Sequence, residues 1–334
     1  MRVCLKTDAA FETMTTMSSS EPILSEAAYF VMQRGNFNSP AALESLMESF
    51  SISKGDRGEF LGLLLLTLAR DSTVGAPDGF GRPEAGKRWF SLADFLYGKL
   101  FRKQSKEASW VDANSINALN MLAVDFPNAQ LHFNHFVKVH EFEAIEIERL
   151  LLLQGRGAAV LCGNNQKAVD SINVFLKDGT KLVKENAAVM SLQWENDSKY
   201  TTPQQKLHDA VDPYDLGILN KGHAAVPLIK VVFALAAKKP LLKVDRHDPT
   251  VAYPAVVYEI WCAGISPDIL GPIERQELAI WQSLLRASYG WKELYETTSE
   301  MTANLRRSAA PGAAGDAGHF DRWAILVSSR LISK

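Results

Sequence analysis

The residues best suited to carry out chemistry lie beside two apolar runs, 158–161 and 187–192. These runs have the length and β-branched content of buried strands. Asp170 lies on the segment between the runs, and Gln193 and Glu195 continue the second run. Residues two apart on a strand project from the same face, so the side chains of Gln193 and Glu195 point together. A strand carboxylate beside oxygen-bearing side chains of the neighbouring strand suits Mg²⁺, which prefers oxygen ligands. The spacing therefore predicts a metal site around Asp170.

A further acid, Glu59, lies at the start of an apolar helix expected at 56–71. The order of a helix glutamate, then Val169 and Asp170 on a strand, then Gln193 at a strand end resembles the PD-(D/E)XK, or restriction-endonuclease-like, superfamily. More narrowly, the chain is similar to the nuclease-like domains of fungal Crinkler-like families that are linked to mobile elements. The resembling segments are 54–71, 129–139, 156–170 and 189–200.

The resemblance implies a metal-dependent endonuclease-like site. Glu59 would be the helix-borne acid, Asp170 the essential carboxylate and Gln193 the replacement for the acidic member of the third motif, and these three would hold Mg²⁺. The family pattern expects lysine where this chain has Glu195. Such a lysine stabilises the negative charge that develops in the transition state, whereas a carboxylate would repel the phosphate. Lys199, a short distance along the chain, is the candidate substitute.

Two alternatives stay open for the helix-borne acid. Without the resemblance, Glu59 is an acid in the first turn of a helix, where the helix dipole favours negative charge. Glu148 is the alternative first-motif acid, because it lies on an acidic helix, expected at 141–153, that directly precedes the strand unit.

Composition limits the class of protein. The 334 residues are 47% hydrophobic with a formal net charge of −2, which allows one large domain or two smaller ones and excludes a histone-like polycation. Three widely spaced cysteines give no disulfide framework and fit a reducing interior. The N-terminus lacks the apolar core of a signal peptide, and the longest apolar run, 61–68, is too short to span a bilayer. We therefore expect an intracellular protein of the nucleus or cytoplasm with no membrane segment.

A basic stretch at 87–106 offers a surface for a nucleic-acid backbone. Its lysines and arginines alternate with aromatic residues, and Asp94 is the counter-charge within the expected helix. The alternative is an ordinary solvated helix face. A glycine-rich segment just before it approaches a phosphate loop, but Arg88 stands where Ser or Thr should bind magnesium, so an ATP site is excluded.

The order of the expected elements favours an α/β (α+β) fold. A central mixed β-sheet, of the restriction-endonuclease-like type by resemblance, would be flanked by helices, and the helix at 56–71 would direct Glu59 toward Asp170. The expected strands are 129–139, 157–162, 168–176, 187–193, 227–237 and 252–262. The expected divisions are a disordered tail at 1–20, a helical part at 21–128, the nuclease-like core at 129–265, C-terminal helices at 266–307, and a flexible linker and tail at 308–334.

Three functions remain consistent with these residues. The first is a metal-dependent nuclease in which water is the nucleophile. The second is a degenerate nuclease that keeps the fold, loses turnover and binds nucleic acid or protein. The third is a structural or interaction protein whose acids are solvated. Glu195 distinguishes the first two, because in a working site it must coordinate metal or point away while a lysine takes its role.

Overall fold

The chain is described by a computed structural model over residues 2–9, 14–18, 20–32, 37–48, 54–75, 88–105, 108–139, 145–163, 169–220 and 225–286. The α-helices are α1 (Pro22–Met32), α2 (Ser39–Glu48), α3 (Lys54–Val74), α4 (Leu92–Leu96), α5 (Ala113–Asp125), α6 (Ile147–Gly155), α7 (Gln205–Ala210) and α8 (Leu278–Arg286). The strands are β1 (Arg2–Thr7), β2 (Met14–Ser18), β3 (Phe90–Ser91), β4 (Gln130–Leu131), β5 (His135–Lys138), β6 (Ala158–Leu161), β7 (Ser171–Leu176), β8 (Ala187–Glu195), β9 (Leu228–Ala234), β10 (Leu241–His247) and β11 (Val257–Ala263).

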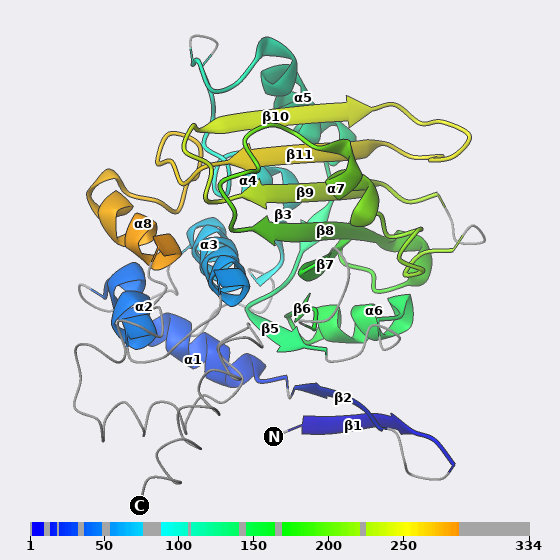
Figure 1. Ribbon diagram of the computed structural model, residues 1–334. Helices are drawn as coiled ribbons and strands as arrows, with labels where there is room; N and C mark the ends of the chain where they lie inside the picture. Colours follow the sequence, from blue (N-terminus) through cyan, green and yellow to red (C-terminus); the bar gives the residue numbers. More distant parts are fainter. Residues whose placement is uncertain are drawn as a thin grey trace, which may run out of the picture.

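One mixed sheet organises the described residues (Figure 1). Nine of their strands belong to it, in the order β10-β11-β9-β8-β7-β4-β3, with β6 pairing with β7 and β5 pairing with β6. The strands β8, β9 and β11 are parallel, while β10 and β7 run antiparallel to their neighbours β11 and β8. This arrangement confirms the predicted α/β (α+β) class with a mixed sheet flanked by helices.

The middle of the sheet is a three-stranded meander followed by a parallel crossover. Strand β7 is antiparallel to both β6 and β8, with Ser171 opposite Leu192. The chain then passes through α7 and returns as β9, which is parallel to β8 with Val189 opposite Leu228. A parallel neighbour requires such a crossover, because a tight turn can only join antiparallel strands.

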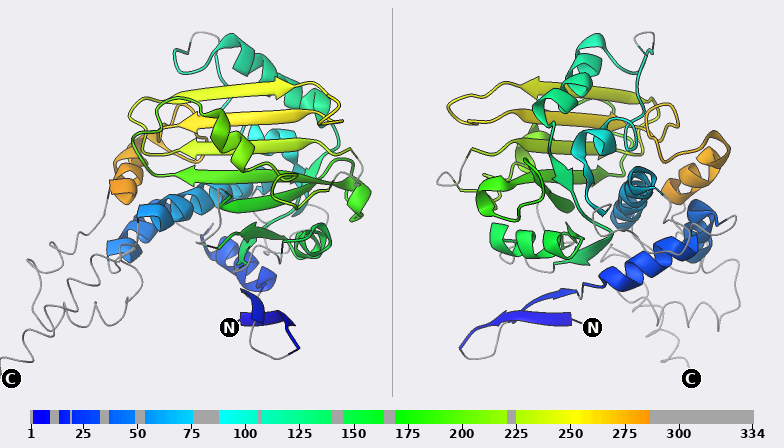
Figure 2. Two further views of the ribbon diagram at one scale, coloured as in Figure 1. Left: turned by 45° about the vertical axis from the view of Figure 1, so that its right-hand side comes forward. Right: turned by 180° about the vertical axis from the view of Figure 1, so that it is seen from behind.

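Helices cover both faces of this part of the sheet. In Figure 1, α7 lies in front of the sheet, and the view from behind in Figure 2 shows α3, α4 and α5 on the opposite face. Strands β9 and β11 are buried along their whole length. Burial on both faces explains their nearly continuous apolar sequences, LIKVVFA and VYEIWCA, which lack the alternation of a half-exposed strand.

Helix α3 packs closely on β8, as the sequence predicts for the helix at 56–71. Glycine makes this approach possible: a Cβ on Gly62 would lie only 2.2 Å from the Trp194 ring, and one on Gly58 would lie 3.2 Å from the Cβ of Asn196. The Trp194 ring stacks on Phe233 of β9 at a centroid distance of 4.3 Å. The start of α3 is therefore held against the carboxyl end of β8.

Two strand predictions are wrong. The expected single strand at 129–139 is two short strands, because β4 pairs with β7 and β5 pairs with β6, and the chain must cross between these partners. The segment joining the last two expected strands contains β10, although its sequence indicated only a connection. Its burial alternates, because α5 covers one face of β10 and the other face is more exposed.

The predicted divisions also need correction. Residues 2–18 of the expected disordered tail include an antiparallel hairpin of β1 and β2, in which Val3 is opposite Met17. The expected helical part at 21–128 is not separate from the core, since β3 joins the main sheet and α5 packs on β10. Of the C-terminal helices expected at 266–307, α8 lies within the described residues and packs against α2 and α3. The linker and tail expected at 308–334 lie outside the described residues.

Candidate functional site

Asp170 lies immediately before β7, where the meander strands meet the end of β8. Its Oδ2 accepts a 2.6 Å hydrogen bond from the backbone N–H of Trp194. Its own backbone N–H donates to the carbonyl of Leu192 at 3.0 Å, and its carbonyl accepts from the N–H of Cys162 at 2.8 Å. Three hydrogen bonds, to β8 and to the residue after β6, therefore hold Asp170 where β7 begins and β8 ends.

The surroundings of Asp170 oppose its ionisation. Burial is the largest cause, and the carboxylates of Glu59 and Glu195 add to it, so that the pKa of Asp170 rises to about 7. The hydrogen bond from the Trp194 N–H acts in the opposite direction. A proton or a cation at this position would relieve the repulsion among the three acids.

The charge of Glu59 raises the pKa of Asp170. Glu59 lies near the start of α3, and its charge reaches both Asp170 and Cys162. Glu148, the alternative first-motif acid, lies on α6 with a largely exposed side chain and forms an ion pair with Lys184. The geometry therefore favours Glu59 as the acid that accompanies Asp170.

Gln193 and Glu195 share one face of β8, as their spacing predicted. The Nε2 of Gln193 donates a 2.9 Å hydrogen bond to Oε1 of Glu195. The Gln193 side chain is 9% exposed, and its Oε1 has no hydrogen-bond partner among the described residues. The buried amide oxygen of Gln193 can therefore still accept a hydrogen bond or coordinate a cation.

Burial outweighs the neighbouring cations at Glu195, so the pKa of this carboxyl is raised. Burial raises its pKa, while Lys199, a hydrogen bond from Tyr200 and the more distant Lys206 act to lower it. Sequence reasoning named Lys199 and missed Tyr200 and Lys206. Both follow the end of β8 within a polar segment whose path over the sheet could not be predicted from its composition.

Lys199 does not occupy the position of the expected motif lysine. Its Nζ lies 3.3 Å from Oδ2 of Asp197 and 4.8 Å from the centre of the Tyr200 ring, and its side chain is 64% exposed. Its hydrogen bonds to Asp197 and Tyr200 raise its pKa. Lys199 therefore remains charged beside Glu195 but is already engaged with other residues at the surface.

The donors around Asp170 fit a hard divalent cation. Asp170 and Glu59 would supply carboxylates, which match the preference of Mg²⁺ for oxygen ligands. Gln193, which the sequence also suggested as a ligand, faces α7 as Ser191 does, whereas Trp194 faces α3, the helix that carries Glu59. The described residues contain no group of three or more His, Cys, Asp or Glu side chains able to hold a metal. These two carboxylates would therefore need several water molecules to complete an octahedral shell, which is usual for Mg²⁺.

A second charged cluster on the α7 face was not foreseen from the sequence. Lys230 of β9 is 3% exposed and lies 2.9 Å from Asp212 and 3.0 Å from Glu259. The hydroxyl of Tyr253 donates to Asp212 at 2.7 Å, and the amide of Gln205 donates to Glu259 at 3.1 Å. This cluster ties α7 and the turn after it to the sheet, and a lone lysine inside the run PLIKVVFALAA was its only local sign.

The basic stretch at 87–106 does not form one continuous basic face. Arg88 is buried, forms an ion pair with Glu26 of α1 and lies over the Tyr29 ring. Arg102 is directed toward the loop after β11, where it donates to two backbone carbonyls at 3.1 Å. Lys87 and Lys106 lie outside the described residues. Of the described basic residues, Lys99 and Lys103 remain the candidates for contacts with a partner.

In the described part of the chain, every helix falls short of the length and apolar character needed to cross a bilayer. Comparisons with protein-family models, with curated proteins and with solved structures find no match to this chain. The geometry of the acidic cluster is therefore the basis for assigning a function.

Proposed function

We propose that this protein is a metal-dependent nuclease-like protein of the PD-(D/E)XK type in which phosphodiester hydrolysis is weak or lost. One observation carries the proposal: α3 packs on β8 and bears Glu59, whose charge raises the pKa of Asp170 at the carboxyl end of β8.

The order of the elements around Asp170 supports the proposal. A helix precedes a three-stranded antiparallel meander, and a crossover containing α7 leads to a parallel strand. Asp170 stands at the start of the second meander strand, while Gln193 and Glu195 stand at the end of the third. This is the placement that the resemblance of the sequence to the superfamily implies.

Electrostatics explains what the cluster can do. Glu59, Asp170 and Glu195 repel one another, and the raised pKa of Asp170 measures this repulsion together with burial. A bound Mg²⁺ would neutralise developing charge on a phosphate and activate a water molecule. The role of Asp170 is to hold the cation at a fixed place, because the Trp194 N–H locks its carboxylate.

Glu195 is the reason for expecting weak hydrolysis. It stands where the family pattern has a lysine, and its carboxylate is held by the Gln193 amide. A phosphate approaching Asp170 would meet this negative charge, and loss of one transition-state donor typically lowers kcat about 10²–10³-fold. Lys199 cannot replace that donor without breaking its ion pair with Asp197.

The second candidate function is a binding module without turnover. The environment of Glu195 favours it, since Gln193, Tyr200 and Lys199 interact with the carboxylate that stands where the family pattern has a lysine. In that case the fold would bind nucleic acid, with the half-buried Lys99 and the exposed Lys103 as cations, or a protein partner, and Asp170 would have no catalytic role.

Cleavage assays with Mg²⁺ or Mn²⁺ test the proposal. The substrates are plasmid DNA, single-stranded DNA and RNA, and the variants are Asp170→Asn, Glu195→Lys and Glu148→Gln. We expect weak cleavage by the natural chain, loss of cleavage in Asp170→Asn, and faster cleavage in Glu195→Lys. Glu148→Gln is the matched control, because it removes an exposed acid on α6 and should leave the rate unchanged.

The outcomes separate the two functions. If Asp170→Asn and the natural chain cleave equally, the activity comes from a contaminant and the nuclease proposal fails. If neither the natural chain nor Glu195→Lys cleaves any substrate and neither binds Mn²⁺, the binding-module function replaces it.

A further inference from the structure

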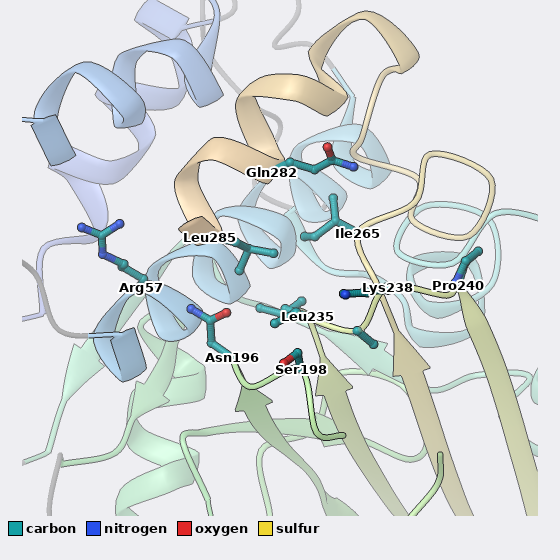
Figure 3. A pocket seen from close by; sticks show the side chains of 12 residues that line it. Arg57, Asn196, Ser198, Leu235, Lys238, Pro240, Ile265, Gln282 and Leu285 are labelled. Carbon is teal, nitrogen blue, oxygen red and sulfur yellow. The ribbon is translucent and has the colours of Figure 1, made fainter. Parts of the chain in front are cut away.

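A cavity of about 570 Å³ lies beside the acidic cluster (Figure 3). Asn196 and Ser198 line it after β8, Ala236 and Lys238 after β9, and Gln282 from α8. The cavity thus opens outside the carboxyl ends of parallel strands, the place where open α/β sheets bind their ligands. Its volume falls in the range of sites that hold small organic molecules.

The lining combines an apolar surface with amide groups. Leu235, Ile265 and Leu285 contribute the apolar part, from the segments after β9 and β11 and from α8. The amides of Asn196 and Gln282 come from different elements, and each can both donate and accept hydrogen bonds. A flat ring with mixed donors and acceptors at its edge, such as a nucleobase, matches this lining better than a purely apolar ligand would.

One cation lies where it can meet a phosphate. Lys238 lines the cavity and its side chain is exposed to solvent. The guanidinium of Arg57 does not serve this purpose, because Figure 3 shows it directed away from the other labelled side chains. Lys238 is therefore the residue suited to the anionic end of a ligand.

Residues that line the cavity are neighbours in sequence of residues in the acidic cluster. Asn196 directly follows Glu195, and the start of α3 touches both places, since a Cβ on Gly58 would lie 3.2 Å from the Cβ of Asn196. Arg57, which lines the cavity, lies two residues before Glu59 on α3. A polynucleotide with one nucleotide in the cavity could continue past Glu195 toward Asp170.

We propose that this cavity binds a nucleotide. Its base lies against Leu235, Ile265 and Leu285, the amides of Asn196 and Gln282 bond the edge of the base, and its phosphate faces Lys238. The assignment of the neighbouring phosphate of a chain to the metal site rests on the proposed function, whereas binding of the nucleotide itself does not. Nucleotide binding in this cavity thus indicates nucleic acid as the substrate class, with one base bound in the cavity.

Calorimetry with the full chain tests the proposal, using adenosine monophosphate, ribose phosphate and a short oligothymidylate as probes. Ala236→Phe should fill the cavity and weaken adenosine monophosphate binding by at least about tenfold. Gln282→Leu removes one amide at nearly constant volume and should weaken it about three- to tenfold. Gln276→Leu is the matched control, because this exposed amide lies on the segment before α8 and lines a different cavity.

Four outcomes overturn the proposal: no binding of either base-bearing probe, unchanged binding in Ala236→Phe, equal loss in Gln282→Leu and Gln276→Leu, or ribose phosphate binding as tightly as adenosine monophosphate. Binding of oligothymidylate well above that of the mononucleotide identifies a chain as the ligand, and equal binding identifies a free nucleotide. Asp170→Asn should abolish Mn²⁺ binding and leave adenosine monophosphate binding intact. Failure of the cavity and failure of the metal site are therefore observed separately.

Discussion

The backbone N–H of Trp194 donates a 2.6 Å hydrogen bond to Asp170, while the indole ring of the same residue packs under α3. The ring stacks on Phe233 and leaves Gly62 no room for a Cβ. Trp194 thus holds Asp170 in place through its backbone, and its ring sets the distance between β8 and α3, the helix that carries Glu59. The distance between the two acids depends on this contact.

Gly62→Ala should disturb the fold and the site together. The added Cβ would lie 2.2 Å from the Trp194 ring, which cannot yield because Phe233 lies behind it. Overpacking of this kind costs about 1–3 kcal/mol or more in the free energy of unfolding. Urea unfolding measures the loss, and Mn²⁺ binding should weaken in the same variant because α3 must move away from β8.

Gly155→Ala is the control for that substitution. A Cβ there would lie 3.2 Å from the end of the Leu182 side chain, which is largely exposed and free to shift. We expect little change in the unfolding midpoint, or a small gain from helix propensity. Equal losses in the two variants would show that the contact with Trp194 is not a special constraint.

Metal-free protein should lose stability as the pH rises from about 4 to about 7. The pKa of Asp170 in the folded state is about 7, whereas that of an unperturbed aspartate is 3.8, so the folded state binds more protons between these values. The free energy of unfolding therefore falls across this interval, by an amount on the order of 4 kcal/mol for this group. Urea unfolding at about pH 5 and about pH 8 should show a smaller difference in Asp170→Asn than in the natural chain. An identical pH dependence in both would contradict the buried, repelled state of Asp170.

Lys230→Met should be strongly destabilising. It keeps the length of the side chain but leaves Asp212 and Glu259 without their buried cation, at a cost of about 3–5 kcal/mol. Adding Asp212→Asn and Glu259→Gln to the same chain should restore much of the loss, because the unpaired charges are then removed. Thermal and urea unfolding measure both effects.

Lys243→Met provides the comparison. Lys243 also contacts two acids, Asp112 and Asp245, each at 3.1 Å, but its side chain is 28% exposed. Solvent screens these pairs, so their loss should cost less than about 1 kcal/mol. If the two lysine variants unfold at the same urea concentration, burial of the Lys230 cluster does not control stability.

Glu195→Gln should strengthen nucleic-acid binding. The substitution removes one negative charge beside the strand end and keeps a side chain of nearly the same shape, so repulsion of a phosphate falls. Fluorescence anisotropy with a short single-stranded oligonucleotide at low salt should show tighter binding, by about two- to fivefold, and the gain should shrink as salt is added. Glu148→Gln changes the net charge equally and should have no such effect; equal gains would indicate a general effect of charge.

The sequence was informative where local chemistry matched the final environment. The apolar runs of β8 and β9 are buried on both faces, so their composition alone identified them. The helix expected at 56–71 was also identified from its apolar composition, and it packs on the sheet as predicted. In both cases the pattern of neighbouring residues already contained the information that the fold uses.

Other features depended on partners far along the chain. The strand β10 alternates between buried and more exposed positions and carries four charged or ionisable residues. Because of these polar residues its sequence resembled a connecting loop, and its place in the sheet depends on pairing with β11. The Lys230 cluster and the cavity at Asn196 each combine residues from several elements. No local pattern could predict that these residues lie together. The antiparallel pair of β1 and β2 was not predicted, because its sequence is rich in serine and threonine.

The most direct test is Mn²⁺ binding to the natural chain, Asp170→Asn and Glu148→Gln, measured by calorimetry at about pH 8, where Asp170 is ionised. We predict that the natural chain and Glu148→Gln bind one ion with equal affinity, and that Asp170→Asn binds at least about tenfold more weakly. Equal binding by all three would show that Asp170 and Glu59 hold no metal and would contradict the nuclease-like assignment.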